Sequence, residues 1–165
     1  MSIEVFSEGL ADTSASLLIQ RVSWIVPTVQ TIHILSIAAV VGSVLVVHLR
    51  NLRVALAGES RAALAQRFLP WIWYAVLVLL VSGAVLITGE PRRSLPNGVF
   101  QLKMAMLAVV LVLTALYQRP LRADPGYWER TRVRRAQVFV LACVSLALWM
   151  AIVFAGRWIA YAVGA

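Results

Sequence analysis

Four long apolar stretches limit what this chain can fold into. They run from about residue 24 to 49, 70 to 88, 100 to 117 and 138 to 159. A bilayer core of about 30 Å needs about 20 apolar residues in an α-helix that rises about 1.5 Å per residue. Helices are required because lipid offers no hydrogen-bond partner to a free backbone amide. The sequence therefore predicts an all-α, integral membrane four-helix bundle within residues 24–165.

The composition indicates lipid rather than water as the solvent of this chain. Hydrophobic residues make up 61% of the 165 residues and charged residues only 13%, whereas a soluble domain carries about 25% charged residues. The net charge of +8 does not indicate nucleic acid, because the arginines lie in short loops between apolar stretches. The lipid bilayer is therefore the expected partner, and nucleic acid is not.

The arginines predict the orientation of the bundle. Most of them lie in the loops after the first and third stretches, and fewer lie on the opposite side. The first group is Arg50, Arg53, Arg61, Arg67, Arg119, Arg122, Arg130, Arg132, Arg134 and Arg135, and the second is Arg21, Arg92, Arg93 and Arg157. Cytoplasmic loops carry the excess of Lys and Arg. We therefore expect both termini on the outer, periplasmic side of a bacterial inner membrane.

Residues 1–23 precede the first apolar stretch. They lack the basic start and apolar core of a cleavable signal peptide. Glu4, Glu8 and Asp12 alternate with apolar residues at roughly helical spacing. An interfacial helix on the outer membrane surface and a disordered leader both fit this pattern.

Several further residues are interpreted as structural. The single Cys143 lies in an apolar stretch, where it cannot form an internal disulfide and is expected to be buried and inert. Pro70 is expected in the first turn of its helix and Pro120 in a turn-rich loop. Ser82 and Gly83 are expected to let helices approach closely. Aromatic residues near the ends of the stretches are expected at the membrane interface; they are Trp24, Trp71, Trp73, Tyr117, Trp158 and Tyr161.

His33 is the most unusual polar residue in these stretches. Polar side chains in hydrocarbon are costly and therefore mark candidate sites. His33 lies about 13 Å below the outer end of its predicted helix, and Gln30 lies about one turn above it on the same face. The side chain is either a neutral histidine hydrogen-bonded between helices, or an axial ligand of haem b, a metal ligand or a proton acceptor. Both interpretations remain open.

His48 is the second histidine and lies near the inner end of the same helix, about 22 Å from His33 along the axis. Two histidines in this arrangement resemble the layout of transmembrane di-haem cytochromes, although the usual plan needs more of them. The neighbouring Arg50 and Arg53 favour an ordinary interfacial histidine. For His33, a second axial ligand could come from Met150, which matches its depth, or from the His33 of a second copy in a homodimer.

Glu90 and Lys103 lie at the outer ends of the second and third stretches. The structural interpretation is an ion pair between them, or a lysine that extends toward the interface. The functional interpretation is an outward-facing polar pocket formed with Gln30 and His33. The depth that these four residues share predicts that they lie close together in the folded bundle.

Short motifs between residues 20 and 120 carry a resemblance to a known family. They are Trp24-x-x-Pro27, Ile32-His33-Ile34-Leu35, Gly42, Leu49-Arg50-x-Leu52, Pro70-Trp71-x-Trp73, Ser82-Gly83, Gly89-Glu90-Pro91, Asn97 and Phe100-x-x-Lys103-Met104. The chain resembles an uncharacterised bacterial four-helix integral membrane family, DUF6644-like, which is distantly similar to membrane cytochrome b and to copper-resistance membrane proteins. The resemblance implies the fold and the membrane location but no established activity.

The family pattern implies which polar residues matter. It has an acid where Gln30 stands and commonly Asp where His48 stands, and these departures weaken a mechanism that needs His48 as a ligand. His33, Glu90 and Lys103 match the pattern.

Three functions are expected from the sequence. The first is a haem b-binding membrane protein that transfers electrons, with His33 as an axial ligand; any enzymatic role would be of the oxidoreductase type. The second is a non-enzymatic transporter or copper-handling protein that uses the same outer pocket. The third is a structural or anchoring subunit of a larger membrane complex. Neither a hydrolase nor a kinase is expected, because the sequence has no nucleophile elbow and no phosphate loop.

Overall fold

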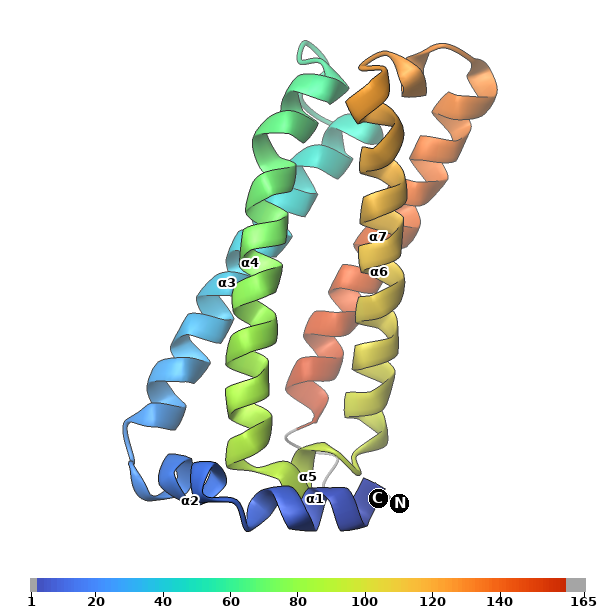
Figure 1. Ribbon diagram of the computed structural model, residues 1–165. Helices are drawn as coiled ribbons and strands as arrows, with labels where there is room; N and C mark the ends of the chain where they lie inside the picture. The colour runs from blue at the N-terminus through green and yellow to red at the C-terminus, as the bar shows by residue number, and fades with distance from the viewer. Residues whose placement is uncertain (1–2, 160–165) are drawn as a thin grey trace.

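The structure is a computed structural model that describes residues 3–159. Tyr161 and both chain ends lie outside the described residues. The long helices are α3 (Ile25–Asn51), α4 (Arg61–Gly89), α6 (Gly98–Ala123) and α7 (Arg132–Trp158). Each is long and apolar enough to cross a membrane, and residues 3–159 contain no strand. The predicted all-α fold with four spans is confirmed (Figure 1).

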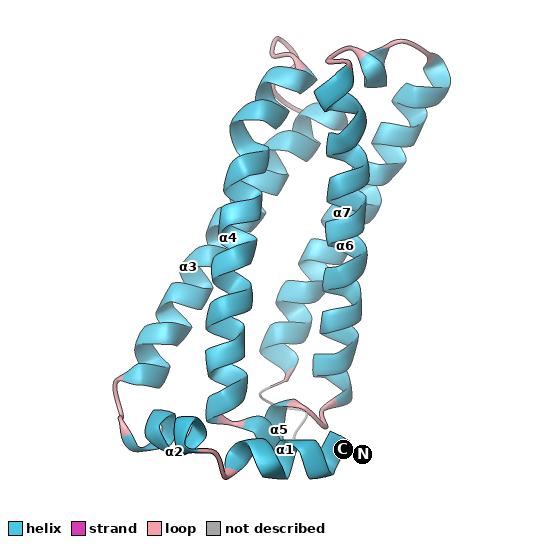
Figure 2. Cartoon of the chain, in the orientation of Figure 1, coloured by secondary structure: helices cyan, strands magenta, loops and turns pink. Residues whose placement is uncertain are grey.

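The four long helices form two pairs (Figures 1 and 2). α3 packs most extensively against α4, and α6 packs most extensively against α7. The pairs meet mainly through α3 and α7, whereas α4 and α6 make little contact. We call the end with the α3–α4 and α6–α7 connections, residues 50–61 and 119–135, the Arg-rich end. The opposite end carries α5 (Pro91–Ser94) and is called the α5 end.

Two short helices, α1 (Ile3–Ala11) and α2 (Ser14–Arg21), lie across the α5 end (Figure 1). Thr13 caps α2 by accepting a hydrogen bond from the backbone N–H of Ser16. The segment is therefore helical rather than a disordered leader. Phe6 and Leu18 are exposed, whereas Ser16 is buried. An apolar surface turned away from the bundle is what an interfacial helix needs for contact with lipid.

α4 begins at Arg61 rather than near residue 70, so the placement of Pro70 in a first turn is wrong. The helix starts there because the Ser60 side chain accepts a hydrogen bond from the N–H of Ala63. Its first part is amphipathic and too polar to count as a span. The buried residues of this part recur at helical spacing; they are Arg61, Leu64, Ala65 and Leu69. Pro120 likewise lies inside α6 rather than in a loop.

The core is concentrated toward the Arg-rich end. Its buried apolar residues lie mostly in the halves of the helices nearest that end; they include Val40, Val44, Val47, Leu69, Ile72, Val110, Tyr117, Leu121, Trp128 and Val138. Tyr117 is 1% exposed, so it packs inside the bundle rather than on its surface. Trp128 belongs to the short 3-10 helix η1 (Tyr127–Glu129), which folds back against α6 and α7. Cys143 is exposed on α7, so its predicted burial is wrong.

Candidate functional site

His33 faces α4 where Ser82 and Gly83 interrupt the apolar surface of that helix. Its Nδ1 atom lies 2.8 Å from Oγ of Ser82. A Cβ atom on Gly83 would lie 3.5 Å from Cε1 of His33. The missing side chain therefore lets the imidazole lie close to the α4 backbone. Ser82 is buried, and His33 is partly buried.

The hydroxyl of Ser82 fixes the tautomer of His33. The Ser82 Oγ atom lies 2.6 Å from the carbonyl oxygen of Val78, to which it donates its only proton. It must therefore accept the hydrogen bond from His33. The proton of the neutral ring then sits on Nδ1, and Nε2 keeps its lone pair. Metal-bound histidines are commonly oriented in this way, with one ring nitrogen donating to a fixed partner and the other left for the metal.

Lys103 and Gln30 lie in the same half of the bundle as His33. The Nζ atom of Lys103 lies 3.5 Å from the position of a Cβ atom on Gly156, in the last turn of α7, where the backbone carbonyls attract a cation. Gln30 is exposed. Among the described residues, neither side chain forms a hydrogen bond or an ion pair with His33.

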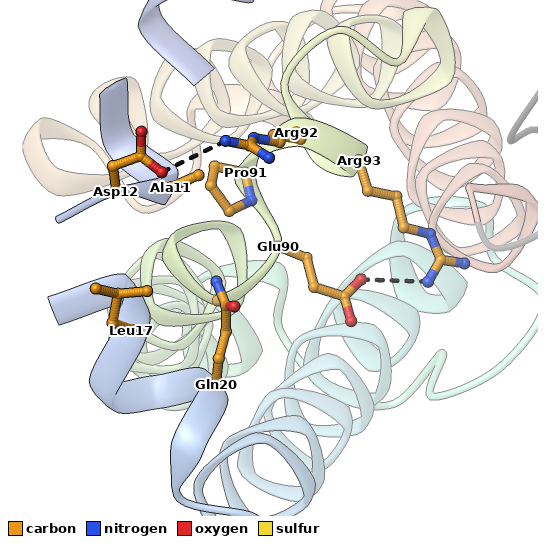
Figure 3. Close-up of a pocket in the computed structure, with 9 residues that line it drawn as sticks. Ala11, Asp12, Leu17, Gln20, Glu90, Pro91, Arg92 and Arg93 are labelled. Carbon is orange, nitrogen blue, oxygen red and sulfur yellow. Dashed lines mark hydrogen bonds and ion pairs between the residues drawn. The ribbon is translucent and has the colours of Figure 1, made fainter. Parts of the chain in front are cut away.

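Glu90 lines a cavity of ≈ 660 Å³ at the α5 end (Figure 3). Its carboxylate pairs with Arg93 at 3.2 Å, and across the same cavity Arg92 pairs with Asp12 at 3.4 Å. The partner of Glu90 is thus an arginine of α5 and not Lys103. The other residues of the predicted polar pocket do not line this cavity. The structure therefore does not bring Glu90 into one pocket with His33.

Met150, the second candidate ligand, lies on α7 with 49% of its surface exposed. It is therefore not enclosed within the bundle beside His33. In residues 3–159, no group of three or more His, Cys, Asp or Glu side chains is placed to hold a metal ion. What the site offers is one oriented imidazole rather than a set of protein ligands.

His48 is buried, with 6% of its surface exposed. Its Nε2 atom lies 2.9 Å from Oγ of Ser145 on α7, and its ring meets that of Tyr117 edge-on at 6.3 Å between centroids. The Nδ1 atom has no partner among the described residues. The expectation of an interfacial histidine close to solvent is wrong, because side chains of α6 and α7 cover this end of α3.

Tyr117 connects His48 to a larger buried network at the Arg-rich end. Its hydroxyl lies 3.4 Å from Oδ1 of Asn51, to which it donates. Its ring stacks on Trp128 at 6.0 Å between centroids, and Nε1 of Trp128 donates to the Tyr117 carbonyl at 3.2 Å. All three residues are buried. The network joins α3, α6 and η1 and gives this end of the bundle a polar but closely packed interior.

Sequence reasoning missed the serine partners of both histidines. For Ser82 a signal existed: counted from the helix ends at the α5 end, Ser82 and His33 both lie about 11 Å deep at 1.5 Å per residue. For Ser145 the same count fails. The predicted spans place it about 9 Å deeper than His48, because that count aligns the ends of the stretches, whereas α7 extends farther past the level of His48 than α3 does. Asn51 and Trp128 were also missed, since Asn51 lies just beyond the first apolar stretch and Trp128 lies in the connection between the third and the fourth.

Four apolar helices with polar groups bonded between them define a multi-pass membrane protein. The chain belongs to the family of unknown function DUF6644, whose family model matches residues 12–162. The family expected from the motifs is thereby confirmed. No curated protein and no solved structure matches the chain. The distant similarity to membrane cytochrome b and copper-resistance proteins stays a prediction.

Proposed function

We propose that this protein binds haem b in the membrane and transfers electrons, with Nε2 of His33 as an axial ligand. The observation that carries the proposal is the hydrogen bond from His33 Nδ1 to Ser82, whose own proton is committed to Val78. It leaves a neutral imidazole with an unprotonated Nε2 held in one orientation. A buried or partly buried imidazole needs a partner for that lone pair, and an iron ion is such a partner.

Haem b suits the residues present better than a bare metal ion does. Haem supplies its own equatorial nitrogen donors, so the protein has to provide axial ligands only. The described residues hold no cluster of three or more metal-ligating acids, histidines or cysteines, which weakens the copper-handling alternative. Bound haem would supply one-electron redox chemistry. His33 would hold it, and the exposed apolar side chains next to His33, such as Ile34, would keep water from its edge.

The second axial ligand distinguishes two versions of the proposal. Met150 is on a different helix and half exposed, so its use requires α7 to turn toward His33. A second copy of the chain would supply its own His33 without such a rearrangement and would make the functional unit a homodimer. The ratio of haem to chain separates them, since the homodimer predicts half a haem per chain and the Met150 version predicts a whole one.

We further propose that the protein lies in the bacterial inner membrane with its Arg-rich end in the cytoplasm and both termini outside. The arginine asymmetry supports this orientation. In a Cys143→Ser background, a cysteine replacing Glu59 should be shielded from an impermeant thiol reagent in whole cells, and one replacing Glu8 should react. The opposite labelling pattern would reverse the topology.

Optical spectroscopy tests the haem proposal. The protein is purified in mild detergent from cells supplied with haem precursors, and its spectrum is recorded oxidised and reduced. A Soret band that shifts on reduction is expected. The His33→Ala variant should lose this band while it still inserts and folds. The Ser82→Ala variant should keep haem but bind it about 10-fold to 100-fold more weakly, because the orienting hydrogen bond is gone.

Two results would contradict the proposal. One is a colourless wild-type protein that also fails to take up added haem. The other is a His33→Ala variant that binds haem as well as the wild type does. Either result would move the assignment to a transporter or to an anchoring subunit, in which His33 and Ser82 only join α3 to α4.

A further inference from the structure

A second cavity lies at the Arg-rich end, far along the bundle from His33. It has a volume of ≈ 360 Å³, within the usual range for sites that hold small ligands. Four arginine side chains and one carboxylate dominate its walls; they are Arg50, Arg53, Arg61, Arg135 and Glu129. The formal charge of these side chains is four positive against one negative. The walls of the cavity therefore carry an excess of fixed positive charge.

The single carboxylate of the cavity, that of Glu129, is already paired with two of the arginines. One oxygen of Glu129, Oε1, lies 3.0 Å from Nη1 of Arg61 and 3.9 Å from Nη2 of Arg50. Arg50 also donates from Nε to the carbonyl oxygen of Glu59 at 2.5 Å. The side chains of Arg53 and Arg135 have no hydrogen-bond or ion-pair partner among the described residues. Two guanidinium groups thus face the cavity without a counter-charge.

Arg61 gives independent support for a ligand. Its side chain is only 3% exposed, yet its Nε atom is buried without any partner in the described part of the chain. A buried, unsatisfied donor on a charged group costs free energy that a further acceptor would recover. The guanidinium presents donors in a planar fork that matches the oxygens of a phosphate. An anionic ligand with several acceptor oxygens would complete its hydrogen bonds.

The depth of the cavity fits a phosphate group at the membrane surface. Arg50 lies in the last turn of α3 and Arg61 in the first turn of α4. Arg50 therefore stands where the apolar part of α3 ends, and Arg61 begins the amphipathic first part of α4 beyond the apolar stretch of that helix. Arg53 has a backbone φ of 60°, a left-handed conformation that is costly for a residue other than glycine. The connection after α3 keeps this conformation at the rim of the cavity.

We propose that this cavity binds a phosphate ester, held by Arg53, Arg61 and Arg135. Two kinds of ligand contain such a group: a phospholipid, in its headgroup, and a soluble phosphate ester. The proposal is independent of haem, since it uses none of the residues around His33.

Phosphatidic acid and glycerol 3-phosphate carry the same phosphate monoester, with and without acyl chains, and serve as the two probes. The full-length protein is delipidated in zwitterionic detergent. Phosphatidic acid bound per chain is counted by native mass spectrometry, and glycerol 3-phosphate binding is measured by isothermal titration calorimetry. The test variant is Arg53→Gln with Arg135→Gln, which removes two unpaired cavity arginines. The matched control is Arg119→Gln with Arg122→Gln, which removes two exposed arginines outside the cavity at the same end.

The wild type should bind saturably at one site per chain. The cavity variant should bind at least about tenfold more weakly, as expected for lost charge-assisted hydrogen bonds, while the control stays within about twofold of the wild type. Binding of phosphatidic acid alone identifies a lipid headgroup as the source, and binding of both probes identifies the phosphate ester itself. The proposal would be overturned if neither probe bound saturably. So would an equal loss in both variants, which would show general surface charge rather than a site.

Discussion

The Arg-rich end and the α5 end each place one histidine of α3 against a serine of another helix, but the surroundings differ. At the Arg-rich end, His48 is 6% exposed and lies within a network that includes Tyr117 and Asn51. At the α5 end, His33 is only partly buried, and it is hydrogen-bonded to Ser82. The same residue type on the same helix can therefore be part of a packed interior or an oriented side chain with a free nitrogen.

The difference arises from which elements pack beside each histidine. Near the Arg-rich end, α3 contacts both α4 and α7, and η1 packs against α6 and α7. Trp128 of η1 fills the space beside Tyr117. Near the α5 end, the bond of His33 joins α3 to α4 alone, and neighbours such as Ile34 and Leu35 are exposed. A ligand has room to approach only where the helices are not closed over the side chain.

Tyr117 provides the strongest test of this contrast in packing. Replacing Tyr117 with Ala should lower the free energy of unfolding by about 3–4 kcal/mol, because a buried ring and its hydrogen bond to Asn51 are lost. Phe154→Ala on α7 should cost less than about 1 kcal/mol, since that ring is 68% exposed. Unfolding by a denaturing detergent, followed by circular dichroism, measures both. Equal losses would mean that the Arg-rich end is no better packed than the α5 end.

A substitution of Glu129 tests how much the Arg61–Glu129 ion pair at the Arg-rich end contributes to stability. Glu129→Ala leaves the guanidinium of Arg61 buried without its carboxylate partner. We expect a loss of about 2 kcal/mol, below the full value for a buried pair because Glu129 is half exposed. The control Glu59→Ala removes an exposed carboxylate at the same end and should change stability by less than about 0.5 kcal/mol. If the two variants unfold alike, the Arg61–Glu129 pair contributes no specific stability.

Asn97 gives a smaller effect at the α5 end. Its side-chain oxygen accepts hydrogen bonds from the backbone N–H groups of Val99 and Phe100, at 2.9 and 3.3 Å, and so caps α6. Asn97→Ala should cost about 1 kcal/mol. Asn97→Asp, which keeps the acceptor and adds a charge favourable at a helix N-terminus, should be close to neutral. Thermal unfolding in detergent measures both, and a loss in the Asp variant as large as in the Ala variant would argue against capping.

The fold was predictable because hydrocarbon imposes a simple rule on sequence. Stretches long enough to span a bilayer must be helical, and the observed helices contain all four predicted stretches almost entirely. The helix ends were less predictable. α4 and α7 continue into polar sequence beyond the apolar stretch, since Ser60 and Thr131 cap amphipathic turns. Hydropathy does not report such extensions.

The candidate site was predictable only in part. The depth and rarity of His33 identified it from the sequence, but its rotation toward Ser82 depends on how α3 packs against α4. Glu90 lies at the end of α4, about 12 Å along the helix from Ser82, and it pairs with Arg93 because α5 brings that arginine beside it. Depth along a helix can be counted from sequence, whereas the direction in which a side chain faces depends on tertiary contacts.

The most direct test of haem binding by His33 compares the two histidines in a single experiment. His33→Ala and His48→Ala are purified from haem-supplied cells, and haem per folded chain is measured beside the free energy of unfolding. We expect opposite patterns for the two variants. His33→Ala should lose the Soret band with a stability loss below about 1 kcal/mol, and His48→Ala should keep its haem but lose about 2 kcal/mol through the broken bond to Ser145 and the cavity left in the core. Loss of haem in His48→Ala with haem retained in His33→Ala would show that His33 is not the ligand and would place the ligand at the Arg-rich end.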